Sequence, residues 1–298
     1  MATTVETTYA QRARYYSSAD GFNIKRPRIP AHVFMAERTR ALDPATPTGF
    51  IALDLSTSLG DEGPATTPLI LARYARIRAN ESLSTRFGAS GEIYYVIAGR
   101  GETTWGGEQL RWDAGDVFCL PGGAGATHRA GAHDAVLWVV TNEPALAFEH
   151  AQPPAPGRAP LEAVHYPGEE IRRQLAAIHR LPADKTMTGK AVTLSSAALE
   201  QQRTCLPSLT LAMNSLQPGE AQRPHRHNAI AVTLVVQGAR CHSMIDGERV
   251  EWVKDAVMIT PPAAVHSHHN EGDDLALFLI VQDGGLYYHC RTMGFSYA

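Results

Sequence analysis

The chain has 298 residues, of which 44% are hydrophobic and 19% charged, so it can bury the core of one large domain or of two ordinary domains. A formal net charge of -3 with scattered lysines and arginines argues against nucleic acid and against a membrane surface as partners. The four cysteines lack CxxC spacing, the N-terminus lacks an apolar signal core and the apolar runs are too short to cross a bilayer, so we expect a cytoplasmic protein.

The predicted elements follow the chain in four segments. Residues 1–45 form an N-terminal arm. Residues 46–148 contain short β-rich runs such as "EIYYVIAG" and "AVLWVV", and residues 196–298 contain a second set, such as "AVTLVVQG" and "LALFLIV". Between them, residues 149–195 combine a Pro-rich linker with the helical pattern "GEEIRRQLAAIHRLP". We therefore predict an all-β fold of two strand-rich halves joined by a short helical linker.

The two halves repeat each other. Residues of the first half recur 140 positions later, through a strand, a Gly-containing hairpin turn, a second strand and a proline. The pairs are Gly107 and Gly247, Glu108 and Glu248, Trp112 and Trp252, Val117 and Val257, and Pro121 and Pro261. Such an ordered series predicts a duplicated small β-barrel or jelly roll, which closes on itself and so avoids exposed edges.

The second half carries two histidines at the start of a buried strand. In "PHRHNAIAVTLVVQG", His225 and His227 point to the same face because side chains alternate along a strand. Ala229, Ala231 and Thr233 share this face, which we assign to the barrel interior. A single interior histidine is more often a hydrogen-bonded core residue than a ligand. Two histidines on one face favour a role as ligands.

A second pair of histidines strengthens this interpretation. His266 and His268, in "PPAAVHSHHN", again share a face and follow the proline turn that closes the second hairpin of the same half. His269 is one residue out of phase with His268, so we expect it to face away from the pocket. Asn270 is expected to stabilise a turn.

These stretches resemble the two cupin motifs. "GEAQRPHRHNAIAVTLVVQG" fits the first motif, and "PPAAVHSHHN" fits the second, with Ala263 where glycine is usual. The chain therefore resembles a bicupin, which implies two jelly-roll (double-stranded β-helix) barrels. Residues 203–295 are most similar to the gentisate 1,2-dioxygenase group, whose relatives act on salicylate and hydroxynaphthoate. That group also has PGE before the HRH and an alanine, here Ala231, in place of the motif glutamate.

The resemblance implies one divalent metal ion per chain, held by His225, His227 and His266. The metal it implies is Fe(II), although imidazole also suits Zn, Ni and Mn. Three neutral imidazoles hold one face of such an ion and leave roughly three octahedral positions open. Because Ala231 replaces a carboxylate, the ion keeps its full positive charge. Such a site suits a small aromatic substrate that chelates through a carboxylate and a phenolate oxygen, with O2 as the second partner in extradiol-type ring cleavage.

His268 stands where the group has a second pocket histidine that contacts substrate or oxygen. We assign it a catalytic role as hydrogen-bond donor or proton shuttle, because the unperturbed pKa of histidine lies near neutrality. The alternative is that His268 only orients His266.

The substrate-binding positions depart from the group. Relatives place a glutamine and an arginine where this chain has Ala229 and Thr233, and that arginine holds the substrate carboxylate. Without the guanidinium, either another arginine enters the pocket or the substrate carries less negative charge. Arg203, Arg223 and Arg291 lie nearest in sequence to the pocket-forming segments. The small side chains on this face favour a bulkier or more apolar ligand. The expected substrate-binding residues are Ala229, Ala231, Thr233 and Arg291.

The first half keeps only parts of the motif. Glu92 occupies the place of the motif glutamate, but Arg86 and Gly88 stand at the HxH positions. His128 lies 140 positions before His268 and so matches that residue rather than a ligand. We expect a degenerate barrel without a metal, kept for packing and assembly, in which Arg86, Glu92 and His128 form a buried polar cluster or bind a small organic anion.

Two functions follow from these observations. The first is an Fe(II)-dependent ring-cleaving dioxygenase of aromatic catabolism that is similar to gentisate 1,2-dioxygenase. The second is a metal-binding cupin without oxygen chemistry, such as a small-molecule sensor, an isomerase or a decarboxylase. The resemblance also implies a homo-oligomer, a dimer or a tetramer, in which the N-terminal arm packs on a neighbour.

Overall fold

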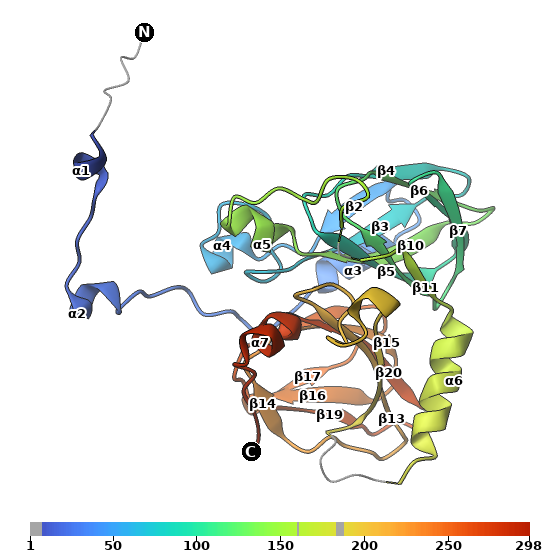
Figure 1. The fold of residues 1–298 in the computed structure, drawn as a ribbon. Coiled ribbons are helices and arrows are strands. Elements are labelled where there is room, and N and C mark those ends of the chain that lie inside the picture. The colour runs from blue at the N-terminus through green and yellow to red at the C-terminus, as the bar shows by residue number, and fades with distance from the viewer. Residues whose placement is uncertain (1–7, 160, 183–187) are drawn as a thin grey trace.

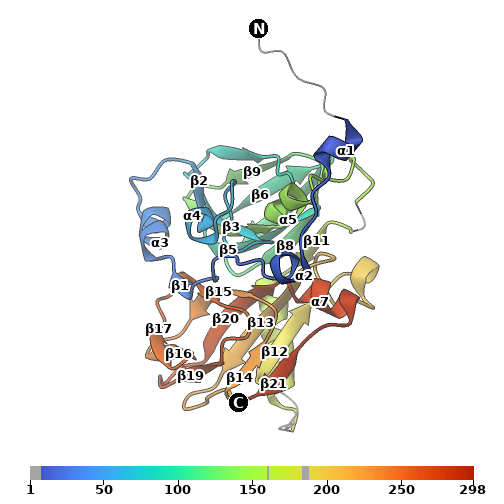
Figure 2. The ribbon, with the colours of Figure 1, turned by 90° about the vertical axis from the view of Figure 1, so that its left-hand side faces the viewer.

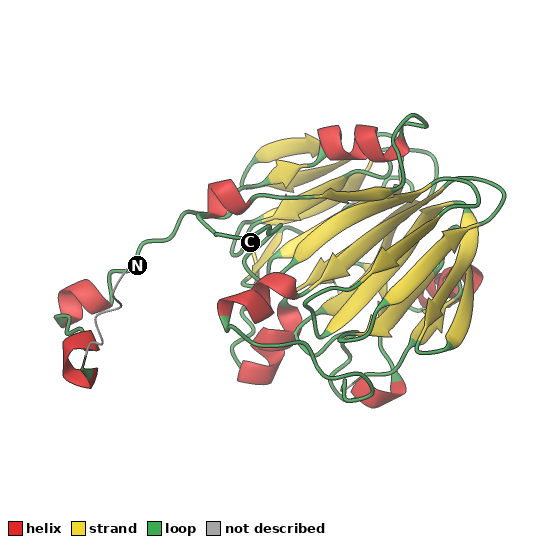
Figure 3. Cartoon of the chain, turned by 90° about the horizontal axis from the view of Figure 1, so that it is seen from above, coloured by secondary structure: helices red, strands yellow, loops and turns green. Residues whose placement is uncertain are grey.

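The computed structural model describes residues 8–159, 161–182 and 188–298; residues 1–7 of the predicted arm and residues 160 and 183–187 of the predicted linker lie outside it. Its body consists of two antiparallel barrels, one above the other in Figure 1, and strands dominate both of them (Figure 3). The predicted all-β fold of two jelly-roll barrels with a short helical linker is confirmed. None of the helices within the described ranges is long and apolar enough to cross a membrane.

The N-terminal barrel is built from two sheets. Its strands are β2 (Gly49–Ala52), β3 (Leu71–Ile77), β4 (Ser82–Thr85), β5 (Gly91–Ala98), β6 (Arg100–Trp105), β7 (Glu108–Asp113), β8 (Val117–Pro121), β9 (Ala126–Ala130), β10 (Ala135–Thr141) and β11 (Val164–Tyr166). The larger sheet has the order β11-β8-β5-β10-β3-β2 and the smaller one β4-β9-β6-β7.

The C-terminal barrel has the same plan. Its strands are β1 (His32–Val33), β12 (Lys190–Leu194), β13 (Thr210–Leu216), β14 (His225–His227), β15 (Ala231–Gln237), β16 (Cys241–Ile245), β17 (Glu248–Glu251), β18 (Val257–Thr260), β19 (His266–Asn270), β20 (Ala276–Gln282) and β21 (Phe295–Tyr297). The larger sheet runs β1-β18-β15-β20-β13-β12 and the smaller one β17-β16-β19-β14-β21. The two larger sheets therefore match strand for strand, as the sequence repeat predicts.

Each repeat begins in the opposite barrel. Strand β1 lies in the segment expected as an arm, yet it pairs with β18 of the C-terminal barrel through His32 and Ile259. Strand β11 lies in the linker and pairs with β8 of the N-terminal barrel through His165 and Phe118. After each of these strands comes a helix, α3 (Met35–Leu42) or α6 (Gly168–His179), which packs on the barrel of its own repeat. The helix α6 is the one predicted from the sequence, and it runs along the side of the C-terminal barrel in Figure 1.

Alternation along the central strands divides the core into three clusters. The largest is shared by the two barrels, because the outer faces of their larger sheets pack together and bring Tyr95 and Trp138 against residues such as Val232. Tyr94, one position from Tyr95, points the other way into the N-terminal barrel. Phe278 belongs to the smaller cluster inside the C-terminal barrel. The remaining helices are short: α1 (Tyr9–Arg12), α2 (Ser18–Gly21), α4 (Ser56–Leu59), α5 (Glu143–Phe148), α7 (Gly284–Cys290) and the 3-10 turn η1 (Ala197–Leu199).

The N-terminal segment with α1 and α2 extends away from both barrels in Figure 1 and lies in front of them in Figure 2. It carries large apolar side chains that are exposed to solvent, among them Tyr15, Tyr16 and Phe22. The chain joins the body of the protein shortly before β1, where Ile29 packs against the largest core cluster.

Candidate metal centre

Three histidines meet at the mouth of the C-terminal barrel. His225 and His227 lie at the two ends of β14, and His266 begins β19, where it pairs directly with His225. The ring centroid of His266 lies 4.3 Å from that of His225 and 4.7 Å from that of His227. One ligand atom from each ring lies within 4.8 Å of the others. The register between β14 and β19 thus brings together side chains that are about 40 positions apart in the sequence.

Backbone carbonyl groups fix the tautomer of each ring. The Nδ1 atoms of His225, His227 and His266 donate to the carbonyl oxygens of Arg223, Ala229 and Ala264 at 2.9, 2.8 and 2.9 Å. A carbonyl can only accept, so Nδ1 carries the proton and the lone pair lies on Nε2. Burial lowers the pKa of each of the three rings, to about 4 for His266. All three are therefore neutral at pH 7 and suited to bind a divalent ion through Nε2.

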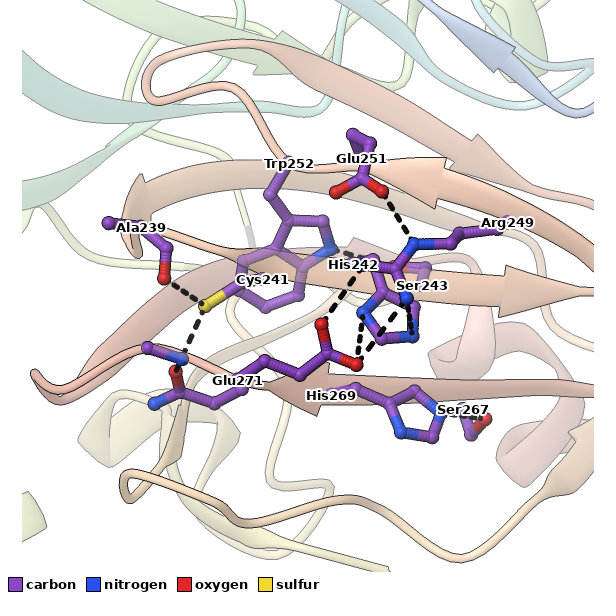
Figure 4. Close-up of polar contacts among 12 residues, drawn as sticks. Ala239, Cys241, His242, Ser243, Arg249, Glu251, Trp252, Ser267, His269 and Glu271 are labelled. Atoms are coloured by element: carbon purple, nitrogen blue, oxygen red, sulfur yellow. Dashed lines mark hydrogen bonds and ion pairs between the residues drawn. The ribbon is translucent and has the colours of Figure 1, made fainter.

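His268 lies beside this cluster, and a hydrogen bond with Ser243 fixes the orientation of its ring. Its ring centroid is 6.0 Å from that of His266, and its Nδ1 atom lies 2.7 Å from the hydroxyl of Ser243. The same hydroxyl accepts a hydrogen bond of 2.8 Å from the indole Nε1 of Trp252, shown with Ser243 in Figure 4. Burial, followed by the proximity of His266, lowers the pKa of His268 well below its usual value. His268 is thus a neutral ring in a fixed orientation.

The histidines line a pocket of about 260 Å³. Ala229, Ala231 and His268 contribute to its wall. Among the described residues that line it there is no aspartate or glutamate. A bound cation would therefore meet nitrogen donors and neutral polar groups, with no carboxylate to offset its charge.

Several residues that line the pocket were not predicted from the sequence, among them Gln282. Gln282, on β20, pairs with Ala231 across the sheet, and its amide donates a 3.2 Å hydrogen bond to Nε2 of His227. This contact agrees with the lone pair assigned to that atom. The sequence does contain a signal for Gln282. In "LALFLIVQ", alternation along the strand places Gln282 on the same face as Phe278 and Ile280. A row of apolar residues that face the barrel interior therefore ends in one polar residue.

Two of the expected substrate-binding residues lie outside this pocket. Thr233 faces the interior of the barrel but is completely buried and does not line the pocket, and its hydroxyl has no hydrogen-bond partner within the described structure. Arg291 follows α7 and lines a neighbouring cavity. Of the other arginines considered, Arg203 lines the same neighbouring cavity, whereas the guanidinium of Arg223 lies 3.9 Å from the ring centroid of Tyr297.

His269 takes the opposite side of β19, as the sequence predicts. It pairs with His242 across the sheet, and the two rings stack at 4.5 Å (Figure 4). Its Nε2 atom lies 2.8 Å from the hydroxyl of Ser267. Asn270 bonds to the backbone of Leu216, Gly272 and Asp274 and so secures the turn that follows β19.

The corresponding space in the N-terminal barrel is filled with side chains. Tyr94 stands where the C-terminal barrel has Thr233, and its ring stacks on Phe118 at 4.6 Å. The Tyr94 hydroxyl donates to Glu92, the counterpart of Ala231. Burial has the largest effect on the pKa of Glu92 and raises it to about 7, although the hydrogen bond from Tyr94 acts in the opposite direction. His128 repeats the surroundings of His268, because its Nδ1 atom lies 2.8 Å from the hydroxyl of Thr103.

Comparison with known proteins agrees with this architecture. Residues 213–282 match the cupin domain family. The chain is 37% identical over 86 residues to 5-aminosalicylate 1,2-dioxygenase from Comamonas sp, which is 29% of this chain and 23% of the relative. It is 32% identical over 85 residues to gentisate 1,2-dioxygenase from Ralstonia sp, which is 28% of this chain and 24% of the relative. The matched segment thus spans about a quarter of these relatives.

The solved structures extend the likeness to both barrels. Salicylate 1,2-dioxygenase from Pseudaminobacter salicylatoxidans superposes with a TM-score of 0.76 at 16% identity, over 95% of this chain and 92% of that chain. A cupin 2 conserved barrel domain protein from Leptotrichia buccalis gives a TM-score of 0.52 at 13% identity, over 87% of this chain and 97% of that chain. The predicted resemblance to a bicupin of the gentisate and salicylate dioxygenase group is confirmed.

Proposed function

We propose that this protein is an Fe(II)-dependent dioxygenase that cleaves the ring of a hydroxylated aromatic acid or a related aromatic compound. One observation carries the proposal: three neutral imidazoles converge on a pocket that no described carboxylate lines. Iron bound there would retain its positive charge and supply the sites at which an aromatic chelate and O2 meet.

In this proposal, His225, His227 and His266 hold the ion and are themselves oriented by the carbonyl groups of Arg223, Ala229 and Ala264. Ala229 and Ala231 leave room for an aromatic ring beside the ion, because neither side chain extends beyond Cβ. Gln282 offers an amide to the pocket once its contact with His227 is released. These groups bind and orient the substrate, and the burial of the site limits the access of water.

His268 would act as the hydrogen-bond donor to the substrate. The hydroxyl proton of Ser243 can go to Nδ1 of His268 at 2.7 Å or to the sulfur of Met258 at 3.6 Å, and the ring nitrogen is the better acceptor. The remaining proton of His268 then lies on Nε2, the free nitrogen of this pocket-lining ring. There it can donate to, or exchange with, an oxygen of the substrate.

An oxygen-uptake screen tests the proposal. The protein is reconstituted anaerobically with Fe(II) and then offered gentisate, salicylates, aminophenols and hydroxynaphthoates in an oxygen electrode. Uptake that depends on one of these aromatics is the expected result. If none of them causes uptake, the second function is favoured, a metal-binding cupin that acts as a sensor, isomerase or decarboxylase. This second function is supported by the absence of a guanidinium group among the described residues that line the pocket.

The N-terminal arm supports a homo-oligomer as the form in which this enzyme works. Tyr15 and Phe22 are 92% and 90% exposed on a segment that extends away from its own barrels. Exposed apolar side chains on an extended segment are typical of a surface that binds another chain. The expected oligomer is a dimer or a tetramer, and sedimentation of the full chain beside a chain that lacks residues 1–30 tests it.

A further inference from the structure

A second and larger cavity adjoins the metal pocket. It has a volume of about 1070 Å³, and we call it the vestibule. Thr210, Ala212, Gln282 and Tyr288 line both cavities, so the two spaces adjoin each other at these side chains. Gln282 stands at the junction, since its amide also bonds to His227 of the metal centre.

The walls of the vestibule are held in place by a close backbone contact. One wall is α7 and the other is formed by residues 199–208. The amide of Leu286 donates to the carbonyl oxygen of Ser208 at 3.3 Å. A Cβ atom added at Gly285 would lie 2.7 Å from the carbonyl oxygen of Pro207, so only glycine permits this approach. The vestibule is thus a fixed feature of the fold.

The vestibule carries uncompensated positive charge. Arg203 and Arg291 line it, and none of the described residues that line it is an aspartate or glutamate. Glu200 and Arg203 both line a smaller adjoining hollow, but they form no ion pair. Arg203 has no side-chain partner in the described part of the chain, and the only bond of the Arg291 guanidinium goes to the carbonyl oxygen of His289. Two guanidinium groups therefore remain available to an anion.

Volume limits what the inner pocket can hold. Drug-sized ligands occupy pockets of about 300–1,000 Å³, so a space of about 260 Å³ accepts little more than one substituted ring. A longer part of a substrate that extends past Gln282 and Tyr288 enters the vestibule. It then reaches the two arginines.

We infer that Arg203 and Arg291 form an anion subsite for a carboxylate that the substrate carries on a side chain or a second ring, away from the oxygens that face the histidines. The inference rests on the proposed function, because it assumes that an aromatic ring occupies the metal pocket. It also accounts for the missing interior arginine, since the guanidinium groups are displaced along the substrate. The substrate class is therefore an elongated aromatic acid.

Two probes that differ only in a remote carboxylate test this subsite. Anaerobic, Fe(II)-loaded protein is titrated by calorimetry with 3-(3,4-dihydroxyphenyl)propionate and with 4-ethylcatechol. We expect the acid to bind about tenfold more tightly at low ionic strength, and this preference to shrink in 0.5 M KCl, because both arginines are exposed. The double variant R203Q/R291Q should lose the preference and keep its affinity for 4-ethylcatechol.

The control variant is R180Q, which removes an exposed arginine at the end of α6, outside both cavities, and should behave like the wild type. Equal affinity of the wild type for the two probes, binding of neither probe, or a preference that survives in R203Q/R291Q would overturn the inference. Failure of the proposed function is read separately, from the oxygen electrode, because the ratio of the two affinities does not depend on turnover.

Discussion

At the scale of single residues, the site depends on which nitrogen of each histidine carries the proton. His225, His227 and His266 each donate Nδ1–H to a carbonyl oxygen two positions away in the sequence. His269 lies on β19 as well, but its ring belongs to the outer face. The same residue type therefore has two different environments within four positions of the chain.

This contrast gives a direct test of the ligands. We expect H227A to lose stoichiometric binding of a divalent metal, because two imidazoles hold a first-row ion much less tightly than three. The matched variant H269A removes an imidazole from the outer face and should retain full occupancy. Metal content after reconstitution and gel filtration measures both. Full occupancy in H227A would contradict the assignment.

A second test uses the duplicated surroundings of His268 and His128. S243A and T103V each remove the one hydroxyl that accepts from a tryptophan indole and contacts a histidine Nδ1. Each should lower the free energy of unfolding by about 1–3 kcal/mol, since two buried polar groups lose a partner. Only S243A should also reduce oxygen uptake, because only His268 faces the metal pocket. An equal loss of uptake in T103V would refute this role of His268.

The buried carboxyl of Glu92 predicts a pH dependence of stability. Because the folded pKa of about 7 lies above the ordinary value of 4.5, the folded state binds more protons between these values. The stability that Glu92 contributes is therefore full below about pH 4.5 and falls as the pH rises toward 7. Urea unfolding should show E92Q gaining up to roughly 3 kcal/mol relative to the wild type between pH 5 and pH 8. E108Q, at an exposed position, serves as the control, and a constant difference would contradict the prediction.

At the scale of elements, strand register decides which predicted residues meet. His225 faces His266, and Ala231 faces Gln282, through pairings that connect strands far apart in the sequence. The helix α7 adds the outer wall of the vestibule. The two motifs contain the histidines and the alanine, whereas Gln282 and α7 lie outside both motifs in the sequence.

The contact between α7 and residues 207–208 can be tested with one methyl group. G285A places Cβ against the backbone of Pro207 and Ser208, at 2.7 Å in each case, and should destabilise the protein by about 1–3 kcal/mol. G49A is the matched control, because a Cβ there meets no atom within 4 Å. Thermal unfolding followed by circular dichroism compares the two variants. An unchanged midpoint in G285A would mean that α7 can move away at little cost.

At the scale of the whole molecule, the two barrels share one core. The largest apolar cluster includes residues of both larger sheets and of both α3 and α6, and the edge strands β1 and β11 are exchanged between the repeats. The barrels should therefore unfold together in one transition. A metal ion in the C-terminal barrel then stabilises the N-terminal barrel as well.

Tryptophan fluorescence can follow this coupling, because Trp105, Trp112 and Trp138 lie in the N-terminal barrel and only Trp252 in the C-terminal one. Divalent metal at about one hundred times its dissociation constant should stabilise the fold by about 2.7 kcal/mol and raise a single midpoint by several degrees. H227A should show no shift. Two separate transitions, of which metal moves only one, would contradict a shared core.

The sequence by itself determined the two-barrel architecture and the helix between the barrels, because hydrophobic alternation, turn glycines and the repeat at 140 positions are local or periodic signals. It also brought His225, His227, His266 and His268 together as candidates, since strand alternation and two short motifs contain them. Only the tertiary structure decided that Thr233 is fully buried and does not line the pocket, that the amide of Gln282 bonds to His227 and that Arg291 lines the adjoining vestibule. These positions depend on the register between distant strands and on the packing of α7, and neither is encoded in the spacing of neighbouring residues.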